Sequence, residues 1–228
     1  MKLLLIRHGE PDYANDCLTD LGRRQAERLG ARLKEEEVAA AFTSPMGRAR
    51  ETADIALGDR DVPLTVCDWL HEFDVAVRDG GPDKMVSVWD MTPKLWTRDG
   101  LLYDREGFAE SELIAGTGAP ERYEAARRGL DALLAERGLV REGGIYRRQG
   151  DCCETLAFFC HFGATCVLIA HLLGVSPVLT LQGFSAEPTA IATLCTDDRF
   201  GSEVNFRLHG YGDISHLDQR ATGRVEYK

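Results

Sequence analysis

Several polar side chains follow predicted strands at the points where those strands end. Arg7 and His8 directly follow the apolar run that opens the chain, and His161 follows a later apolar segment. Arg48 lies one turn into the helix predicted after a short strand, and Glu72 follows another short strand. Because ligands bind outside the carboxyl ends of the strands in open α/β sheets, we expect these side chains to converge in one crevice. Two arginines there would attract an anionic ligand.

The elements that must position these residues alternate between strand and helix. Apolar runs and helical periodicity predict strands at 2–7, 39–43, 64–67, 144–149, 154–160, 189–196 and 204–209, and helices at 19–34, 45–57, 120–136 and 163–173. This alternation is typical of an α/β layer architecture with a mainly parallel sheet. We expect Thr19 to cap the first helix, and Ser44-Pro45 to start the second. The two strands that flank Gly150-Asp151 are expected to pair with each other.

Composition sets broad limits on function. The chain has 228 residues, which fits one domain, and 44% of them are hydrophobic, which is ample for a core. The formal net charge of −10 disfavours a nucleic-acid partner. No stretch approaches the ~20 apolar residues of a membrane-spanning helix, and the opening apolar run is too short for a signal peptide. Seven irregularly spaced cysteines do not suggest a secreted disulfide framework. We therefore expect a cytoplasmic protein without a membrane partner, of unknown oligomeric state.

Several segments together resemble the histidine phosphatase superfamily, the phosphoglycerate mutase-like proteins. Leu5-Ile6-Arg7-His8-Gly9-Glu10 is similar to the family signature, and Cys160-His161-Phe162-Gly163-Ala164-Thr165 is similar to its second-histidine motif. Segments 18–26, 43–53 and 70–72 resemble its first two helices and its acid-bearing loop. Each motif alone is weak evidence, but their order and their positions beside predicted strands make the combination specific.

The resemblance implies a fold and a mechanism. It implies a three-layer α/β/α sandwich with a mainly parallel central sheet, in which neutral His8 attacks phosphorus and becomes phosphorylated. Arg7, Arg48 and His161 would bind the phosphoryl oxygens, with His161 expected to be protonated when the dianion binds. Glu72 would protonate the leaving alkoxide and then deprotonate water, which requires a raised pKa. No metal or other cofactor enters this scheme, and the partner is a small phosphorylated substrate or inorganic phosphate.

Each of these assignments has an alternative. Arg50 is a second candidate for the arginine in the second helix, and neighbouring phenylalanines are compatible with His161 as a core histidine. Glu72 could instead be a solvated carboxylate in a loop, in which case Asp12 or Glu10 would supply the acid.

Cys17 and Arg23 have the Cys-x5-Arg spacing of cysteine-based phosphatases. That loop needs small residues whose amides wrap a phosphate between a buried strand and a helix. The segment between them contains one glycine and follows a Pro-Asp-Tyr loop. We therefore interpret the spacing as a coincidence.

Three functions remain open: phosphomonoester hydrolysis, phosphoryl transfer to a second hydroxyl as in a mutase, and binding without catalysis. The segments rich in Tyr, Lys and Arg that follow the acid in mutases are not found after Glu72, which favours hydrolysis. Phe162-Gly163 follows the second histidine where the acid-phosphatase branch carries Asp, which favours the smaller branch, branch 1. Residues 1–228 are expected to form one domain. A cap or insert at about 69–118 is expected to cover the phosphate pocket and set specificity, with ordinary packing as the alternative.

Overall fold

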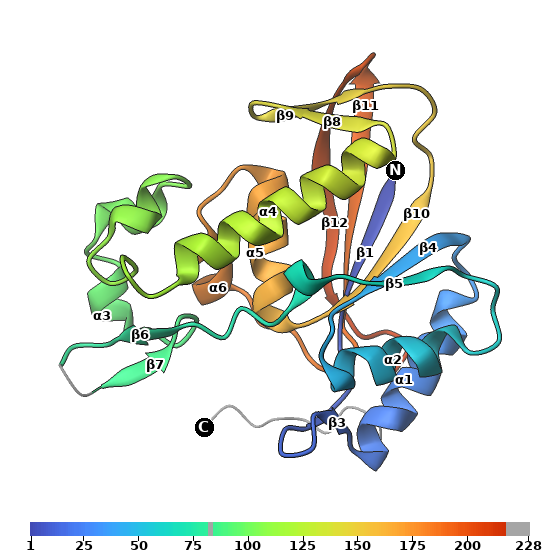
Figure 1. Cartoon of the computed structure of the whole chain (residues 1–228), viewed down its shortest axis with the longest axis horizontal. Helices are drawn as coiled ribbons and strands as arrows, with labels where there is room; N and C mark the ends of the chain where they lie inside the picture. Colours follow the sequence, from blue (N-terminus) through green and yellow to red (C-terminus); the bar gives the residue numbers. More distant parts are fainter. Residues whose placement is uncertain (82–83, 218–228) are drawn as a thin grey trace.

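The computed structural model describes residues 1–81 and 84–217 (Figure 1). An eight-stranded sheet has the order β5-β4-β10-β1-β11-β12-β9-β8. Its strands are β1 (Lys2–Arg7), β4 (Val38–Thr43), β5 (Leu64–Val66), β8 (Leu139–Glu142), β9 (Ile145–Arg148), β10 (Thr155–Cys160), β11 (Ile191–Phe200) and β12 (Glu203–Asp213). Two small hairpins stand apart from it, β2 (Pro11–Asp12) with β3 (Cys17–Leu18) and β6 (Ala76–Arg78) with β7 (Met85–Ser87).

Helices cover both faces of the sheet. They are α1 (Asp20–Leu33), α2 (Gly47–Leu57), α3 (Pro93–Trp96), α4 (Ala119–Glu136), α5 (Phe162–Leu173) and α6 (Pro177–Gly183), with single 3₁₀ turns η1 (Asp68–Leu70), η2 (Gly100–Tyr103) and η3 (Gly107–Glu110). Successive side chains of a strand point to opposite faces. In β1, Leu4 and Ile6 join the core cluster of α1 and α2, whereas Leu3 and Leu5 join that of α4, α5 and α6. The predicted α/β sandwich is confirmed.

The sheet is mixed in direction. The four strands β5, β4, β10 and β1 are parallel, as predicted, and they form the half that carries the candidate site. Beyond β1, the sheet continues with β11, β12, β9 and β8, each antiparallel to its neighbour. Short turns join β8 to β9 and β11 to β12, and they contain Gly143 and Gly201 at positive φ. Such short connections permit only antiparallel neighbours, so this half departs from the mainly parallel expectation.

Two local predictions are wrong. The strands that flank Gly150-Asp151 do not pair, because β9 pairs with β8 and β12 while β10 lies between β1 and β4. The uninterrupted apolar run of β10 is typical of a central parallel strand. Ser44 does not start a helix, since α2 begins at Gly47 after Met46. The Ser44 amide still donates to the Phe159 carbonyl oxygen (3.0 Å) and so continues the strand ladder. Thr19 caps α1 as predicted, accepting from the Gly22 amide at 3.0 Å.

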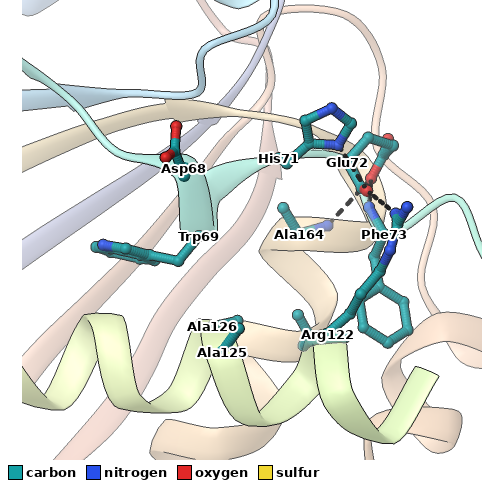
Figure 2. Close-up of a pocket in the computed structure, with 10 residues that line it drawn as sticks. Asp68, Trp69, His71, Glu72, Phe73, Arg122, Ala125, Ala126 and Ala164 are labelled. Atoms are coloured by element: carbon teal, nitrogen blue, oxygen red, sulfur yellow. Dashed lines mark hydrogen bonds between the residues drawn. The ribbon is translucent and has the colours of Figure 1, made fainter. Parts of the chain in front are cut away.

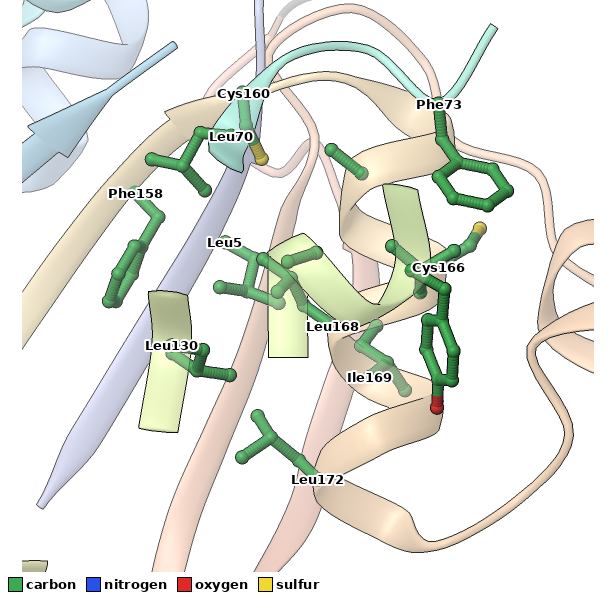
Figure 3. Packing of buried hydrophobic residues seen from close by; sticks show 14 of the residues in the cluster. Leu5, Leu70, Phe73, Leu130, Phe158, Cys160, Cys166, Leu168, Ile169 and Leu172 are labelled. Atoms are coloured by element: carbon green, nitrogen blue, oxygen red, sulfur yellow. The ribbon is translucent and has the colours of Figure 1, made fainter. Parts of the chain in front are cut away.

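The main core lies between the sheet, α4 and α5. Figure 3 shows Leu168 of α5 among the core side chains of this cluster, together with Leu5 of β1 and Leu130 of α4. The same cluster contains Leu70 and Phe73 from the predicted insert. Further buried residues of the insert are Val75, Val77, Val88, Met91, Leu102, Phe108 and Ile114. Much of segment 69–118, of which residues 82–83 lie outside the described part, therefore packs as an integral part of the core.

Candidate active site

Strand register places the two predicted histidines side by side. β1 and β10 are parallel neighbours with Arg7 opposite Cys160, so His8 and His161 leave the sheet together. The His8 amide donates to the Cys160 carbonyl oxygen at 3.0 Å, and the two imidazole centroids are 5.1 Å apart. Both side chains are buried. The sheet thus brings them together at the carboxyl ends of its central strands.

Hydrogen bonds determine which nitrogen of His8 is free. Its Nδ1 lies 2.7 Å from the Gly9 carbonyl oxygen, which can only accept, so Nδ1 carries the hydrogen. Nε2 is therefore unprotonated, and it accepts from Nε of Arg48 at 3.3 Å. Burial, together with the charges of Arg7 and Arg48, lowers the pKa of His8 from 6.5 to about 3. At neutral pH the ring is uncharged, with the Nε2 lone pair available for attack.

His161 is hydrogen-bonded to Ser44. The Ser44 hydroxyl oxygen accepts from the Met46 amide at 3.3 Å and lies 2.8 Å from Nε2 of His161. The hydroxyl can donate its own hydrogen to Nε2, and in that tautomer the imidazole hydrogen lies on Nδ1. That Nδ1 is buried and has no hydrogen-bond partner among the described residues. Burial, with smaller contributions from the neighbouring charges, lowers the pKa of His161 well below its usual value. In that tautomer the neutral ring presents Nδ1–H as a donor, and the protonation expected when the dianion binds stays a prediction.

Two arginines line the same site. Arg7 donates through Nη1 to the Ala186 carbonyl oxygen, and its buried Nε has no partner within the described residues. Arg48 is only 6% exposed, and its guanidinium reaches His8. Arg50, the alternative considered from the sequence, is exposed on the outer side of α2. The structure therefore places Arg48, and not Arg50, in the site.

Glu72 reaches the site from the segment that follows η1. Figure 2 shows its carboxylate on the amides of Phe73 and Ala164, which donate to Oε1 at 2.7 and 3.2 Å. Burial raises the pKa of Glu72, although these amides and the arginines act in the opposite direction. A side chain at Gly163 would place Cβ 2.8 Å from Oε1, so the glycine allows the carboxyl group to approach the start of α5. Glu72 therefore has the environment of a carboxylic acid that retains its proton more readily than usual.

The alternative acids are engaged elsewhere. Oε2 of Glu10 accepts from the Thr19 hydroxyl at 2.6 Å, at the start of α1. Asp12 is not buried, and hydrogen bonds from the Asn15 side chain and the nearby loop amides lower its pKa. Neither residue lines the cavity in front of the arginine, whereas Glu72 does.

A cavity of about 310 Å³ opens in front of Arg7 and Glu72. Its other lining residues are Tyr13, Trp89, Asp90, Phe162, Leu181, Gln182, Phe184, Ser185 and Ala186. Trp89 meets Phe162 edge to face, with ring centroids 5.9 Å apart. Trp89 and Asp90 belong to the predicted insert, so this segment contributes to the wall of the cavity. A second cavity, of about 270 Å³, also borders Glu72 and lies against α4 (Figure 2).

Two residues of the site were missed by sequence reasoning. Ser44 was interpreted as a helix cap, although its position directly after the strand that neighbours β10 is a usable signal. Asp16, which pairs with Arg48 at 2.6 Å, comes from a loop and has no recognisable sequence signal. The structure does not favour the Cys-x5-Arg alternative, since Cys17 lies in the short strand β3 and Arg23 is paired with Glu51 at 2.7 Å. Within residues 1–81 and 84–217, no three or more His, Cys, Asp or Glu side chains are grouped so that they could hold a metal ion. In the same described part of the chain, no helix combines the length and the hydrophobicity that a membrane crossing requires.

Comparison with known proteins defines the class to which this site belongs. Residues 3–207 match the model of the histidine phosphatase superfamily, branch 1, and the chain belongs to this family. It is 26% identical over 238 residues to the adenosylcobalamin/alpha-ribazole phosphatase of Salmonella typhi, covering 99% of this chain and 100% of the relative. The predicted family and the predicted enzyme class, a phosphatase, are confirmed.

Solved structures show the same fold. YhfR of Bacillus stearothermophilus has a TM-score of 0.61 at 24% identity, over 95% of this chain and 99% of the other. A phosphoserine phosphatase variant of Entamoeba histolytica, solved with phosphoserine, has a TM-score of 0.61 at 22% identity, with the same coverage of 95% and 99%. A mycobacterial glucosyl-3-phosphoglycerate phosphatase has a TM-score of 0.63 at 18% identity, over 92% of this chain and 98% of the other.

Proposed function

We propose that this protein hydrolyses phosphate monoesters without a metal, and that Nε2 of His8 is the phosphoryl acceptor. The observation that carries the proposal is the unprotonated Nε2 of a neutral, buried imidazole, which accepts from Nε of Arg48. Beside it, the Nε–H donor of Arg7 and Nδ1 of His161 are buried and have no partner among the described residues. Unpaired buried donors need an acceptor, and phosphoryl oxygens accept strongly from such groups.

The proposed reaction has two steps. In the first, the lone pair of His8 Nε2 forms a bond to phosphorus, and the phosphorus–oxygen ester bond breaks. The leaving oxygen keeps the electron pair of that bond and takes the proton of Glu72, while Arg7, Arg48 and His161 stabilise the phosphoryl oxygens. In the second, Glu72 removes a proton from water, whose oxygen attacks phosphorus. The nitrogen–phosphorus bond breaks, its electron pair returns to Nε2, and inorganic phosphate leaves.

Hydrolysis has more support than the two alternatives. The curated relative from Salmonella typhi and the solved relative from Entamoeba histolytica are both named phosphatases. A mutase must protect its phosphohistidine from water, and nothing in the residues after Glu72 resembles the segments that mutases carry. A binding protein without activity would not need an acid with a raised pKa, which Glu72 has.

We propose a small phosphorylated metabolite as the substrate. Among the relatives, one is named for adenosylcobalamin and alpha-ribazole, and another was solved with phosphoserine. The cavity in front of Arg7 combines the aromatic rings of Trp89, Phe162 and Phe184 with the carboxylate of Asp90. Such a lining fits a leaving group with an apolar part and a polar part. We propose that the insert contributes to specificity through Trp89 and Asp90. The seven free cysteines also favour a reducing, cytoplasmic location.

The test is hydrolysis of para-nitrophenyl phosphate in EDTA by the wild type and His8→Ala. His209→Ala is the matched control, because His209 is exposed on β12. The proposal expects turnover in the wild type and the control, and none in His8→Ala at equal folded concentration. Activity that survives in His8→Ala, or that EDTA removes from the wild type, contradicts it.

A further inference from the structure

We propose that Asp16 is a positioning residue of the same site, which holds Arg48 so that one edge of its guanidinium faces the nucleophile. This inference rests on the proposed function. Oδ1 of Asp16 lies 2.6 Å from Nη1 of Arg48, and Oδ2 accepts from the Gly47 amide at 2.6 Å. One carboxylate therefore links the guanidinium to the first amide of α2.

The Asp16 contact, here called the clamp, uses Nη1 of Arg48 and leaves the Nε–Nη2 edge facing His8 and Met46. Its Nε donates to Nε2 of His8 at 3.3 Å, and its Nη2 lies 3.4 Å from Sδ of Met46. A thioether sulfur is a weak acceptor, so a phosphoryl oxygen can replace it readily. Nε and Nη2 form the side of a guanidinium whose two N–H groups point the same way, which suits two oxygens of one phosphoryl group. Asp16 accepts from Nη1, which lies on the other side of the guanidinium, and so directs the Nε–Nη2 edge toward His8.

The loop that carries Asp16 is shaped for this contact. Asp16 has φ of 47°, in the left-handed region, which aspartate tolerates better than most residues. Its carbonyl oxygen approaches Gly47 so closely that a Cβ there would lie 2.2 Å away. Tyr13 of the same loop places its ring 5.4 Å from the Arg48 guanidinium carbon. Partial burial opposes ionisation of Asp16, but the Gly47 amide and Arg48 outweigh it and lower the pKa.

Two other roles for Asp16 make different predictions. If it only anchors the loop to α2 through Gly47, its replacement should do equal damage whether or not Arg48 is present. If it competes with substrate for Arg48, its replacement should raise kcat/KM and strengthen inhibition by inorganic phosphate. A positioning residue instead lowers kcat when replaced, and only while the arginine that it positions is present.

The first experiment is a double-mutant cycle of Asp16→Asn and Arg48→Ala, measured on para-nitrophenyl phosphate. Asp12→Asn is the matched control, since Asp12 is a partly buried carboxylate at the start of the same loop that accepts from Ala14 and Asn15 and has no bond to Arg48 within the described residues. We expect Asp16→Asn to lower kcat by about ten- to a hundred-fold with a smaller change in KM, because misplacing a catalytic group by about 1 Å can cost about a hundred-fold. In the Arg48→Ala background it should have little further effect. An unchanged kcat, an increased kcat/KM, or an equal loss in both backgrounds overturns the proposal.

The second experiment does not depend on turnover. In the wild type, the Arg48 Nε–H bonded to His8 should exchange slowly with solvent and give a distinct NMR signal, assigned by its absence in Arg48→Ala. Asp16→Asn should abolish this signal, and Asp12→Asn should retain it. If the signal persists in Asp16→Asn, the clamp is not needed and the inference is wrong. If the wild type lacks turnover but shows the Asp16-dependent signal, the proposed function fails while the positioning role stands.

Discussion

Replacing Glu72 by glutamine tests the proton of Glu72 separately from the hydrogen bonds that hold its side chain. Glu72→Gln keeps an oxygen for the amides of Phe73 and Ala164, which now donate to Oε1 at 2.7 and 3.2 Å, so the fold should survive. The variant loses the proton that would pass to the leaving oxygen. Because general acids contribute typically about 10²- to 10⁴-fold, we expect kcat for an alkyl phosphate to fall within that range. Nitrophenolate leaves with much less protonation, so phosphorylation of the enzyme by para-nitrophenyl phosphate should be affected less.

The raised pKa of Glu72 adds a dependence on pH. The acid form is lost as pH rises through the folded-state pKa, which burial places above the usual 4.5. The kcat for an alkyl phosphate should therefore fall on the alkaline side in the wild type, and Glu72→Gln should lack this limb. Ionised Glu72 also costs stability above its unfolded pKa, so Glu72→Gln should be more stable than the wild type at pH 7, with a smaller gain near pH 4.

The assay compares phosphate release from glycerol phosphate with the burst of nitrophenol, across pH, for the wild type and Glu72→Gln. Glu27→Gln is the control, because Glu27 is an exposed glutamate of α1 that lines neither cavity beside Glu72. An alkyl-phosphate kcat that Glu72→Gln leaves unchanged would refute the reasoning. So would an equal loss in the alkyl and aryl phosphorylation steps.

Three further predictions follow from the packing and the burial of the site. Gly163→Ala should lower kcat by about ten- to a hundred-fold by displacing Glu72, whereas Gly183→Ala, where an added Cβ meets nothing within 4 Å, should not; steady-state kinetics measures both. Because the His8 pKa is lowered to about 3, the unfolded state binds more protons below 6.5, so stability falls as pH drops. The free energy of unfolding should therefore fall between pH 7 and pH 5 by about 2 kcal/mol less in His8→Gln than in the wild type, as measured by urea unfolding. Trp89→Ala should raise KM more for aromatic than for alkyl phosphates, and equal changes in KM would count against its role in the cavity wall.

The sequence predicted best the residues that directly follow central strands. Arg7, His8 and His161 come together because β1 and β10 are parallel and in register, and the apolar runs that form those strands are easily recognised. Arg48 lies in the helix predicted after β4, but the choice between Arg48 and Arg50 depended on the resemblance to the family. Glu72 reaches the site along a short irregular segment, and here the resemblance to the family was needed in addition to the pattern.

The features that sequence reasoning missed depend on contacts between distant segments. Asp16 meets Arg48 only because a loop with φ of 47° packs against the start of α2, and no local pattern encodes that approach. Ser44 is a residue type that commonly caps helices, but its amide donates to the Phe159 carbonyl oxygen of β10, so tertiary structure overrides the local preference. The strand that follows Gly143 pairs with its nearest neighbours, because a tight turn forms a hairpin more easily than the longer connection to β10.

The proposed mechanism requires a phosphoryl group bound covalently to His8. Glu72→Gln, mixed with para-nitrophenyl phosphate in EDTA and quenched in alkali, should show an intact mass increased by one phosphoryl group, because loss of the base slows hydrolysis of the intermediate. Fragmentation should locate this group on His8, and it should be absent when His8→Gln is combined with Glu72→Gln. A phosphoryl group on another residue, or its persistence in the double variant, would contradict the central claim.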